Sequence, residues 1–68
     1  MKFGNKLSKL RKEHNLSQEQ LADKLEVSRQ AVSKWESGQS YPDMDKIIIL
    51  CKLFNCSIDE LINGKEPV

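Results

Sequence analysis

The chain has 68 residues, of which 31% are charged and 38% hydrophobic, so it holds one small domain and is neither a disordered chain nor a membrane protein. The net charge of +1 is unevenly spread, because residues 1–38 carry eight Lys or Arg against five Asp or Glu, whereas residues 39–68 carry three against five. The balance of +3 in the first part permits a basic face for a polyanion, although most charge runs are only solvated surface.

An amphipathic helix is predicted over residues 3–14. Its stripe residues recur at spacings of four, three and four, and they are Phe3, Leu7, Leu10 and His14. Asn15 then suits the left-handed position that ends a helix. We assign His14 to packing near the end of this helix, because no recognisable motif places a nucleophile or a second catalytic group near it.

A capping box marks the start of a second helix at about Gln18. Ser17 and Gln20 have the S-x-x-Q spacing in which the serine oxygen and the glutamine each satisfy a free backbone donor. The apolar residues of this helix occupy one side, and they are Leu21, Ala22 and Leu25. They end at residues 26–27, where Ser28 offers a cap for the next helix.

Three more helices follow. The third helix is predicted over residues 29–37, because Gly38 suits the left-handed backbone conformation that ends a helix and the segment 39–42 cannot continue one. Asp43 caps a fourth helix that ends near Asn55. A second capping box, at residues 57–60, starts a short fifth helix that residues 63–64 stop.

These elements predict an all-α domain of five helices over residues 1–64, followed by a tail or the start of a linker at residues 65–68. No segment alternates with period two for long enough to be a strand. Small Ala22 stands where the second and third helices would cross closely. The predicted core consists of Leu7, Leu10, Leu16, Leu21, Ala22, Leu25, Val32, Trp35, Ile47, Leu50, Cys51, Phe54, Leu61 and Ile62.

The sequence predicts no metal, cofactor or membrane. Cys51 and Cys56 lie five residues apart and His14 is the lone histidine, so no zinc spacing exists and both cysteines are expected as reduced thiols in or near the core. The longest apolar run, residues 47–51, is far shorter than the roughly 20 residues of a membrane span. No signal-peptide pattern opens the chain, and a cytoplasmic location is expected.

The two sides of the predicted helix 29–37 differ in kind. At about 100° per residue, Ala31, Val32 and Trp35 share one side, so Trp35 is expected in the core rather than stacked on a base. The other side is a row without acids, formed by Arg29, Gln30, Ser33, Lys34 and Ser37. Arg, Gln, Ser and Lys hydrogen-bond base edges, whereas the alternative interpretation is an ordinary polar, solvated helix face.

The layout of helix, three-residue turn and helix favours the interpretation that the polar row of residues 29–37 contacts base edges. Residues 16–22 (LSQEQLA) and 27–38 (VSRQAVSKWESG) closely resemble the helix-turn-helix domain of the Cro and phage-repressor type, which many small bacterial transcription regulators share. The resemblance covers about residues 3–64, including the entry to the fourth helix at 41–43 and the ending at 57–64. It implies a fold like that of lambda repressor, with the third helix in the major groove of DNA.

The resemblance also implies roles for single residues. Positions that match its base-reading residues are Arg29, Gln30, Ser33 and Lys34. Positions that match its phosphate contacts are Gln18, Ser28, Ser37 and the backbone of Gln39. Gln18 and Ser28 also stand at predicted helix N-termini, where backbone N–H groups and the helix dipole favour an anion. Arg11 and Glu36 match a salt bridge that joins the first helix to the end of the third.

One residue departs from the family's pattern. The turn between the second and third helices often carries glycine in this family, and Glu26 stands there in this chain. A non-glycine residue with positive φ is tolerable but strained by roughly 1 kcal/mol or more. Glu26 is therefore expected to affect the local dihedral angles of the turn, while the helix-turn-helix motif itself is still predicted.

The resemblance implies a sequence-specific regulator of transcription, repressor-like, that binds double-stranded DNA. A homodimer that is weak in solution and binds an inverted repeat is expected, because one short helix reads only a few base pairs. Candidate dimer contacts are Ile58 and Glu60, as in relatives, and the apolar pair Ile49 and Leu53, which alternatively belongs to the core.

The alternative function is a protein-interaction module of the antitoxin or co-regulator type. An enzyme is not expected, because the chain is small and lacks a catalytic constellation, and no small-molecule ligand is evident.

Overall fold

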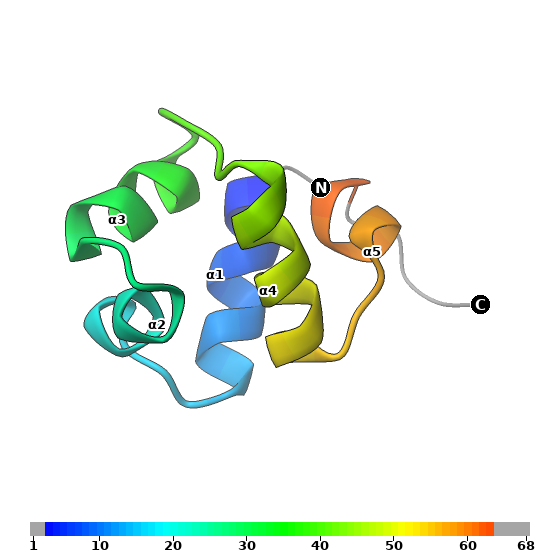
Figure 1. Cartoon of the computed structure of the whole chain (residues 1–68), viewed down its shortest axis with the longest axis horizontal. Coiled ribbons are helices and arrows are strands. Elements are labelled where there is room, and N and C mark those ends of the chain that lie inside the picture. Colours follow the sequence, from blue (N-terminus) through cyan, green and yellow to red (C-terminus); the bar gives the residue numbers. More distant parts are fainter. Residues whose placement is uncertain (1–2, 64–68) are drawn as a thin grey trace.

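A computed structural model describes residues 3–63, and five α-helices follow one another in the predicted order (Figure 1). They are α1 (Phe3–Glu13), α2 (Gln18–Leu25), α3 (Arg29–Ser37), α4 (Met44–Phe54) and α5 (Ile58–Asn63). Between residues 3 and 63 no strand is present, so the predicted all-α class is confirmed. The tail predicted at residues 65–68 lies outside the described residues.

The helices are arranged around α1 and α4, with α2 and α3 on one side and α5 on the other (Figure 1). α3 packs against both α1 and α2, and α5 packs against α1 and α4. Two helices thus support α3 from the inside of the domain. Its remaining side faces away from the rest of the molecule.

The helix starts are those that the caps predict. Ser17 Oγ accepts a hydrogen bond from the Gln20 backbone N–H at 3.0 Å, and the Gln20 side chain accepts one from the Ser17 N–H at 2.8 Å. Ser28 Oγ caps α3 at 3.1 Å from the Ala31 nitrogen, and Asp43 caps α4 at 3.0 Å from the Lys46 nitrogen. Each cap satisfies a backbone donor that a helix start leaves free.

The helix ends also follow the sequence. Asn15, Gly38 and Asn55 adopt left-handed backbone angles, with φ of 58°, 83° and 52°. Such residues turn the chain away from the helix axis while their N–H groups bond the last carbonyls. The predicted stops at Asn15 and Gly38 are therefore confirmed, and Asn55 ends α4 in the same way.

The core gathers apolar side chains from all five helices. Its buried hydrophobic members are Phe3, Leu7, Leu10, Leu21, Ala22, Leu25, Val32, Trp35, Ile47, Leu50, Phe54 and Leu61. Phe3 was absent from the predicted set. Its ring lies at the start of α1 with its centroid 5.5 Å from that of Tyr41, in the segment between α3 and α4.

Three predicted core residues are only half-buried, so their assignment to the buried core was wrong. Leu16, Cys51 and Ile62 pack against the core from its edge. Cys51 and Ile62 each directly follow a fully buried leucine, and a step of about 100° around the helix turns them toward its flank. Leu16 lies in the connection between α1 and α2, outside both helices.

His14 packs at the end of α1, as predicted. Its ring centroid lies 4.9 Å from that of Phe54 on α4, and its Nδ1 is 2.9 Å from the carbonyl oxygen of Leu10. The residue is otherwise exposed. The imidazole thus covers the edge of the core.

The contact of α2 with α3 leads to a first prediction, for Ala22. This residue is 2% exposed and belongs to the buried core, so a leucine there adds three carbon atoms to a packed interior. Ala22→Leu should lower the free energy of unfolding by about 1–3 kcal/mol, measured by thermal denaturation. Lys24→Leu, at an exposed position of the same helix, is the control. An Ala22→Leu protein with the parent melting temperature would show that the two helices do not cross closely.

Candidate nucleic-acid interface

The turn between α2 and α3 keeps a left-handed residue without glycine. Glu26 has φ 58° and ψ 42°, and its N–H lies 3.2 Å from the carbonyl oxygen of Asp23. The Val27 N–H bonds the Ala22 carbonyl at 3.0 Å, which closes the turn. The glutamate therefore adopts the conformation that a glycine would adopt more easily, at a cost of roughly 1 kcal/mol, and the helix-turn-helix geometry is retained.

α3 has the two different sides that the sequence predicts. Val32 and Trp35 are 0% and 6% exposed and pack into the core, with Ala31 half-buried beside them. The opposite side carries the four predicted base-reading residues. Of these, Arg29, Gln30 and Lys34 are exposed and Ser33 is half-buried. The structure thus presents two cations and an amide on one outward-facing surface.

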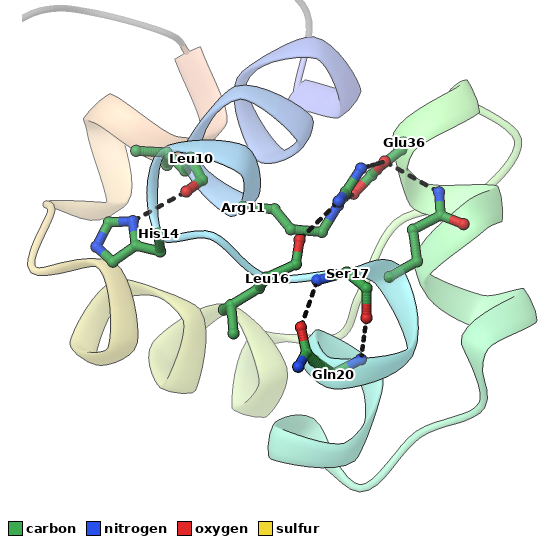
Figure 2. A network of polar contacts seen from close by, with 8 residues as sticks. Leu10, Arg11, His14, Leu16, Ser17, Gln20 and Glu36 are labelled. Carbon is green, nitrogen blue, oxygen red and sulfur yellow. Dashed lines mark hydrogen bonds and ion pairs between the residues drawn. The ribbon is translucent and has the colours of Figure 1, made fainter.

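The acid of α3 is turned away from this surface. Glu36 Oε2 accepts a hydrogen bond from Arg11 Nε at 2.6 Å, and Glu36 Oε1 accepts one from Arg11 Nη2 at 3.1 Å. The two side chains are 11% and 9% exposed, so this bidentate ion pair is largely shielded from water. Arg11 also donates through Nη1 to the carbonyl oxygen of Leu16 at 2.8 Å (Figure 2). The positive charge on the outer side of α3 is therefore not offset by the helix's own carboxylate.

Two of the four predicted phosphate contacts keep a free donor. Gln18 is half-buried at the first position of α2 and donates from Nε2 to Glu36 Oε1 at 3.1 Å, which uses one of its two N–H groups. Ser28 accepts the capping bond through Oγ, so its own O–H remains available to donate. Both side chains lie beside the free backbone N–H groups of a helix start.

The other two predicted phosphate contacts already donate within the protein. The Ser37 hydroxyl lies 3.2 Å from the carbonyl oxygen of Lys34, and the Gln39 backbone N–H lies 2.9 Å from the same oxygen. Both bonds stabilise the end of α3. A phosphate that approached them would have to share these hydrogens with Lys34.

One buried residue that positions α3 is absent from the site predicted from the sequence. A Cβ atom at Gly4 would lie 2.4 Å from the carbonyl oxygen of Glu36 and 2.8 Å from that of Trp35. The start of α1 therefore touches the backbone at the end of α3, and only glycine allows this approach. The signal in the sequence is a glycine within an otherwise regular helical pattern.

The candidate dimer residues are unequally accessible. Ile49 and Ile58 are 39% and 44% exposed, whereas Leu53 is half-buried against the core. Glu60 is half-buried, and its backbone N–H bonds Ser57 Oγ at 3.1 Å in the cap of α5. Apolar surface thus exists at Ile49 and Ile58, while Leu53 and Glu60 serve mainly their own domain.

The two cysteines lie together at the end of α4. Both are free and half-buried, and burial is the main cause that raises the pKa of the Cys56 thiol to about 11. Within residues 3–63 no three His, Cys, Asp or Glu side chains are grouped so that they could hold a metal ion. None of the helices in this part of the chain has the length and apolar character to span a membrane.

Comparison with known proteins identifies relatives along almost the whole chain. A sequence profile of the helix-turn-helix family matches residues 7–61. The HTH-type transcriptional activator BcrR of Enterococcus faecalis is 53% identical over 68 residues, which is all of this chain and 33% of BcrR. The antitoxin PezA of Streptococcus pneumoniae is 34% identical over 60 residues, 88% of this chain and 38% of PezA. The chain thus spans about a third of the length of these curated relatives.

A solved structure matches the fold closely. The P22 c2 repressor, crystallised in complex with a synthetic operator, superposes with a TM-score of 0.89 at 29% identity. The match covers 96% of this chain and 98% of the repressor chain. All five helices therefore have counterparts in a compact DNA-binding repressor domain.

Proposed function

The chain belongs to the helix-turn-helix family of transcription regulators of the Cro and phage-repressor type, and from this premise we propose that α3 binds the major groove of a specific double-stranded DNA operator. The observation that carries the proposal is the outer side of α3. It presents Arg29, Gln30 and Lys34 to solvent, while Glu36 is held inside by Arg11. A helix face that carries cations and hydrogen-bond donors for base edges, and no acid, is suited to contact with DNA.

The proposed division of labour has two parts. Arg29, Gln30, Ser33 and Lys34 contact base edges, and the start of α2 at Gln18 and the start of α3 at Ser28 contact phosphates. Ser37 and the Gln39 backbone contribute to the phosphate contacts by sharing their hydrogens with Lys34. Phosphate contacts supply most of the affinity, which therefore falls as salt rises.

We further propose that two copies bind one inverted repeat. The DNA-binding domain spans residues 1–64, and two recognition helices spaced by about one helical turn, roughly 34 Å, gain the specificity that one short helix lacks. Ile58 and Ile49 supply exposed apolar surface for the contact, with Glu60 and Leu53 at its edge. Selection of binding sites from random duplex DNA tests this directly, because sites without an inverted repeat would contradict the dimer.

The direction of regulation follows from where the operator lies. The relatives named above include an activator and a repressor. We propose repression at operators that overlap a promoter, by a protein that acts in the cytoplasm.

The second prediction concerns specificity. Arg29→Ala or Gln30→Ala should each remove about 1–3 kcal/mol of binding free energy for a selected operator and less for a scrambled duplex, because each gives up a base-edge pair. Gln18→Ala should instead weaken binding to both duplexes, with little change in the salt slope, because glutamine carries no charge that would release a counterion. Fluorescence anisotropy at two salt concentrations distinguishes these patterns.

The same experiment tests the alternative function. If Arg29→Ala and Gln30→Ala both leave the ratio of operator to scrambled affinity unchanged, α3 does not read DNA. The alternative, a protein-interaction role of the antitoxin type, would then be preferred. The similarity to the antitoxin PezA is the reason to consider this role.

A further inference from the structure

We propose that Glu36 is a positioning residue for DNA binding, because its carboxylate holds the side-chain amide of Gln18 so that the second N–H of that amide is fixed for a phosphate. The inference rests on the DNA binding proposed above. It gives Glu36 a function in addition to its ion pair with Arg11. It also explains how residues from three helices act on one contact.

The geometry places Glu36 at the centre of a small network. Its Oε1 accepts hydrogen bonds from Gln18 Nε2 and from Arg11 Nη2, both at 3.1 Å, and its Oε2 accepts one from Arg11 Nε at 2.6 Å. Arg11 in turn donates to the Leu16 carbonyl oxygen at 2.8 Å, just before α2. The carboxylate thus connects α1, the end of α3 and the start of α2 (Figure 2).

The hydrogen bond from Gln18 determines what the glutamine can do. A primary amide has two N–H donors and one carbonyl acceptor, and a phosphate can use only the donors. Glu36 takes one donor, which fixes the amide with its nitrogen toward the carboxylate. The second N–H then points in one direction, and the side chain loses little further freedom when a phosphate binds.

Simple electrostatics gives the opposite expectation for Glu36. A carboxylate near a polyanion repels it, so removal of the charge should strengthen binding. In this structure the charge is already paired with Arg11 and largely shielded from water. The sign of the effect of Glu36→Gln therefore separates a positioning role from a purely Coulombic one.

A double-mutant cycle tests the inference. The parent chain, Gln18→Ala, Glu36→Gln and the double variant are titrated against a selected operator and a scrambled duplex by fluorescence anisotropy, at a temperature where circular dichroism shows all four folded. Gln18→Ala should weaken binding to both duplexes by roughly ten-fold, the range of one charge-assisted hydrogen bond. Glu36→Gln should weaken binding to both by a smaller factor, because a glutamine carbonyl at position 36 still accepts a hydrogen bond from Gln18, without the charge that strengthens it. The double variant should bind no more weakly than Gln18→Ala alone, because Glu36 acts on the phosphate contact only through Gln18.

Glu19→Gln is the matched control, since Glu19 is an exposed acid in the first turn of α2. Its neutralisation should leave DNA affinity unchanged or raise it slightly. A Glu36→Gln protein that binds more tightly than the parent chain, or a double variant whose loss is the product of the two single losses, would overturn the proposal. A lower melting temperature alone would not support it, because the ion pair with Arg11 predicts that result as well.

A second measurement needs neither DNA nor a stable Glu36 variant. In the nuclear magnetic resonance spectrum of the free protein, the chemical shifts and nuclear Overhauser contacts of the two side-chain amide protons of Gln18 should fit a single orientation of the amide next to Glu36. Averaged shifts of a freely rotating glutamine would overturn the inference even if Glu36→Gln fails to fold. Conversely, a parent chain that binds neither duplex would contradict the proposed function, while the Gln18 amide signals would still decide whether Glu36 holds this side chain.

Discussion

Replacement of Arg11 by methionine is expected to lower the free energy of unfolding by about 3–5 kcal/mol. Methionine fills a similar volume but leaves the Glu36 carboxylate without its cation, in a site where that side chain is 9% exposed. An unpaired charge in such a site is costly because water cannot replace the lost partner. A domain stabilised by roughly 5–15 kcal/mol would lose a large part of its stability, and urea denaturation measures the difference.

Two further variants isolate the cause of this loss. Lys12→Met removes a cation from an exposed position next in the chain and should change stability by no more than about 0.5 kcal/mol. The double change Arg11→Met with Glu36→Leu should recover much of the stability, because an apolar pair leaves no unpaired charge. If Arg11→Met alone costs less than about 1 kcal/mol, water reaches the carboxylate and the pair acts as a surface ion pair.

Gly4→Ala should destabilise the protein by about 1–3 kcal/mol, although alanine is the better helix former. Helix propensity alone predicts a gain of roughly 0.5–1 kcal/mol for this change in a helix. The added Cβ would lie 2.4 Å from the Glu36 carbonyl oxygen, and the obstacle is backbone that cannot rotate away. α1 and α3 must therefore separate, with the strain typical of an overpacked core.

The control for Gly4 is a second alanine on the same helix. Asn5→Ala, at the next and exposed position of α1, should leave the melting temperature unchanged or raise it. Thermal denaturation of the two variants then gives shifts of opposite sign. A rise in melting temperature for Gly4→Ala would show that the two helices have space to spare.

Local features of the fold could be predicted from the sequence because their causes are local. Ser17, Ser28 and Asp43 each act on a backbone group three residues away, and Asn15 and Gly38 need only their own dihedral angles. The two sides of α3 follow likewise from the period of a helix. Pattern alone thus placed Arg29, Gln30 and Lys34 on an exposed face.

Features that depend on distant residues could not be obtained in this way. The bond from Gln18 to Glu36 joins positions 18 apart in the chain, and the contact of Gly4 with the end of α3 joins positions more than 30 apart. Leu53 is half-buried because of how the helices pack against one another, and the spacing of apolar residues along one helix does not reveal that packing. Arg11 and Glu36 were paired only through the resemblance to a known family.

The separation of roles around α3 has a consequence for how such a regulator can change its target during evolution. Residues that hold the helix in place, such as Gly4, Arg11 and Glu36, contact its inner side or its end. Arg29, Gln30 and Lys34 stand on the outside and are exposed to solvent. Substitutions at such surface positions usually alter stability by no more than about 0.5 kcal/mol. If α3 reads DNA as we propose, new operator preferences can arise by one or two substitutions on this face, without a compensating mutation elsewhere in the domain.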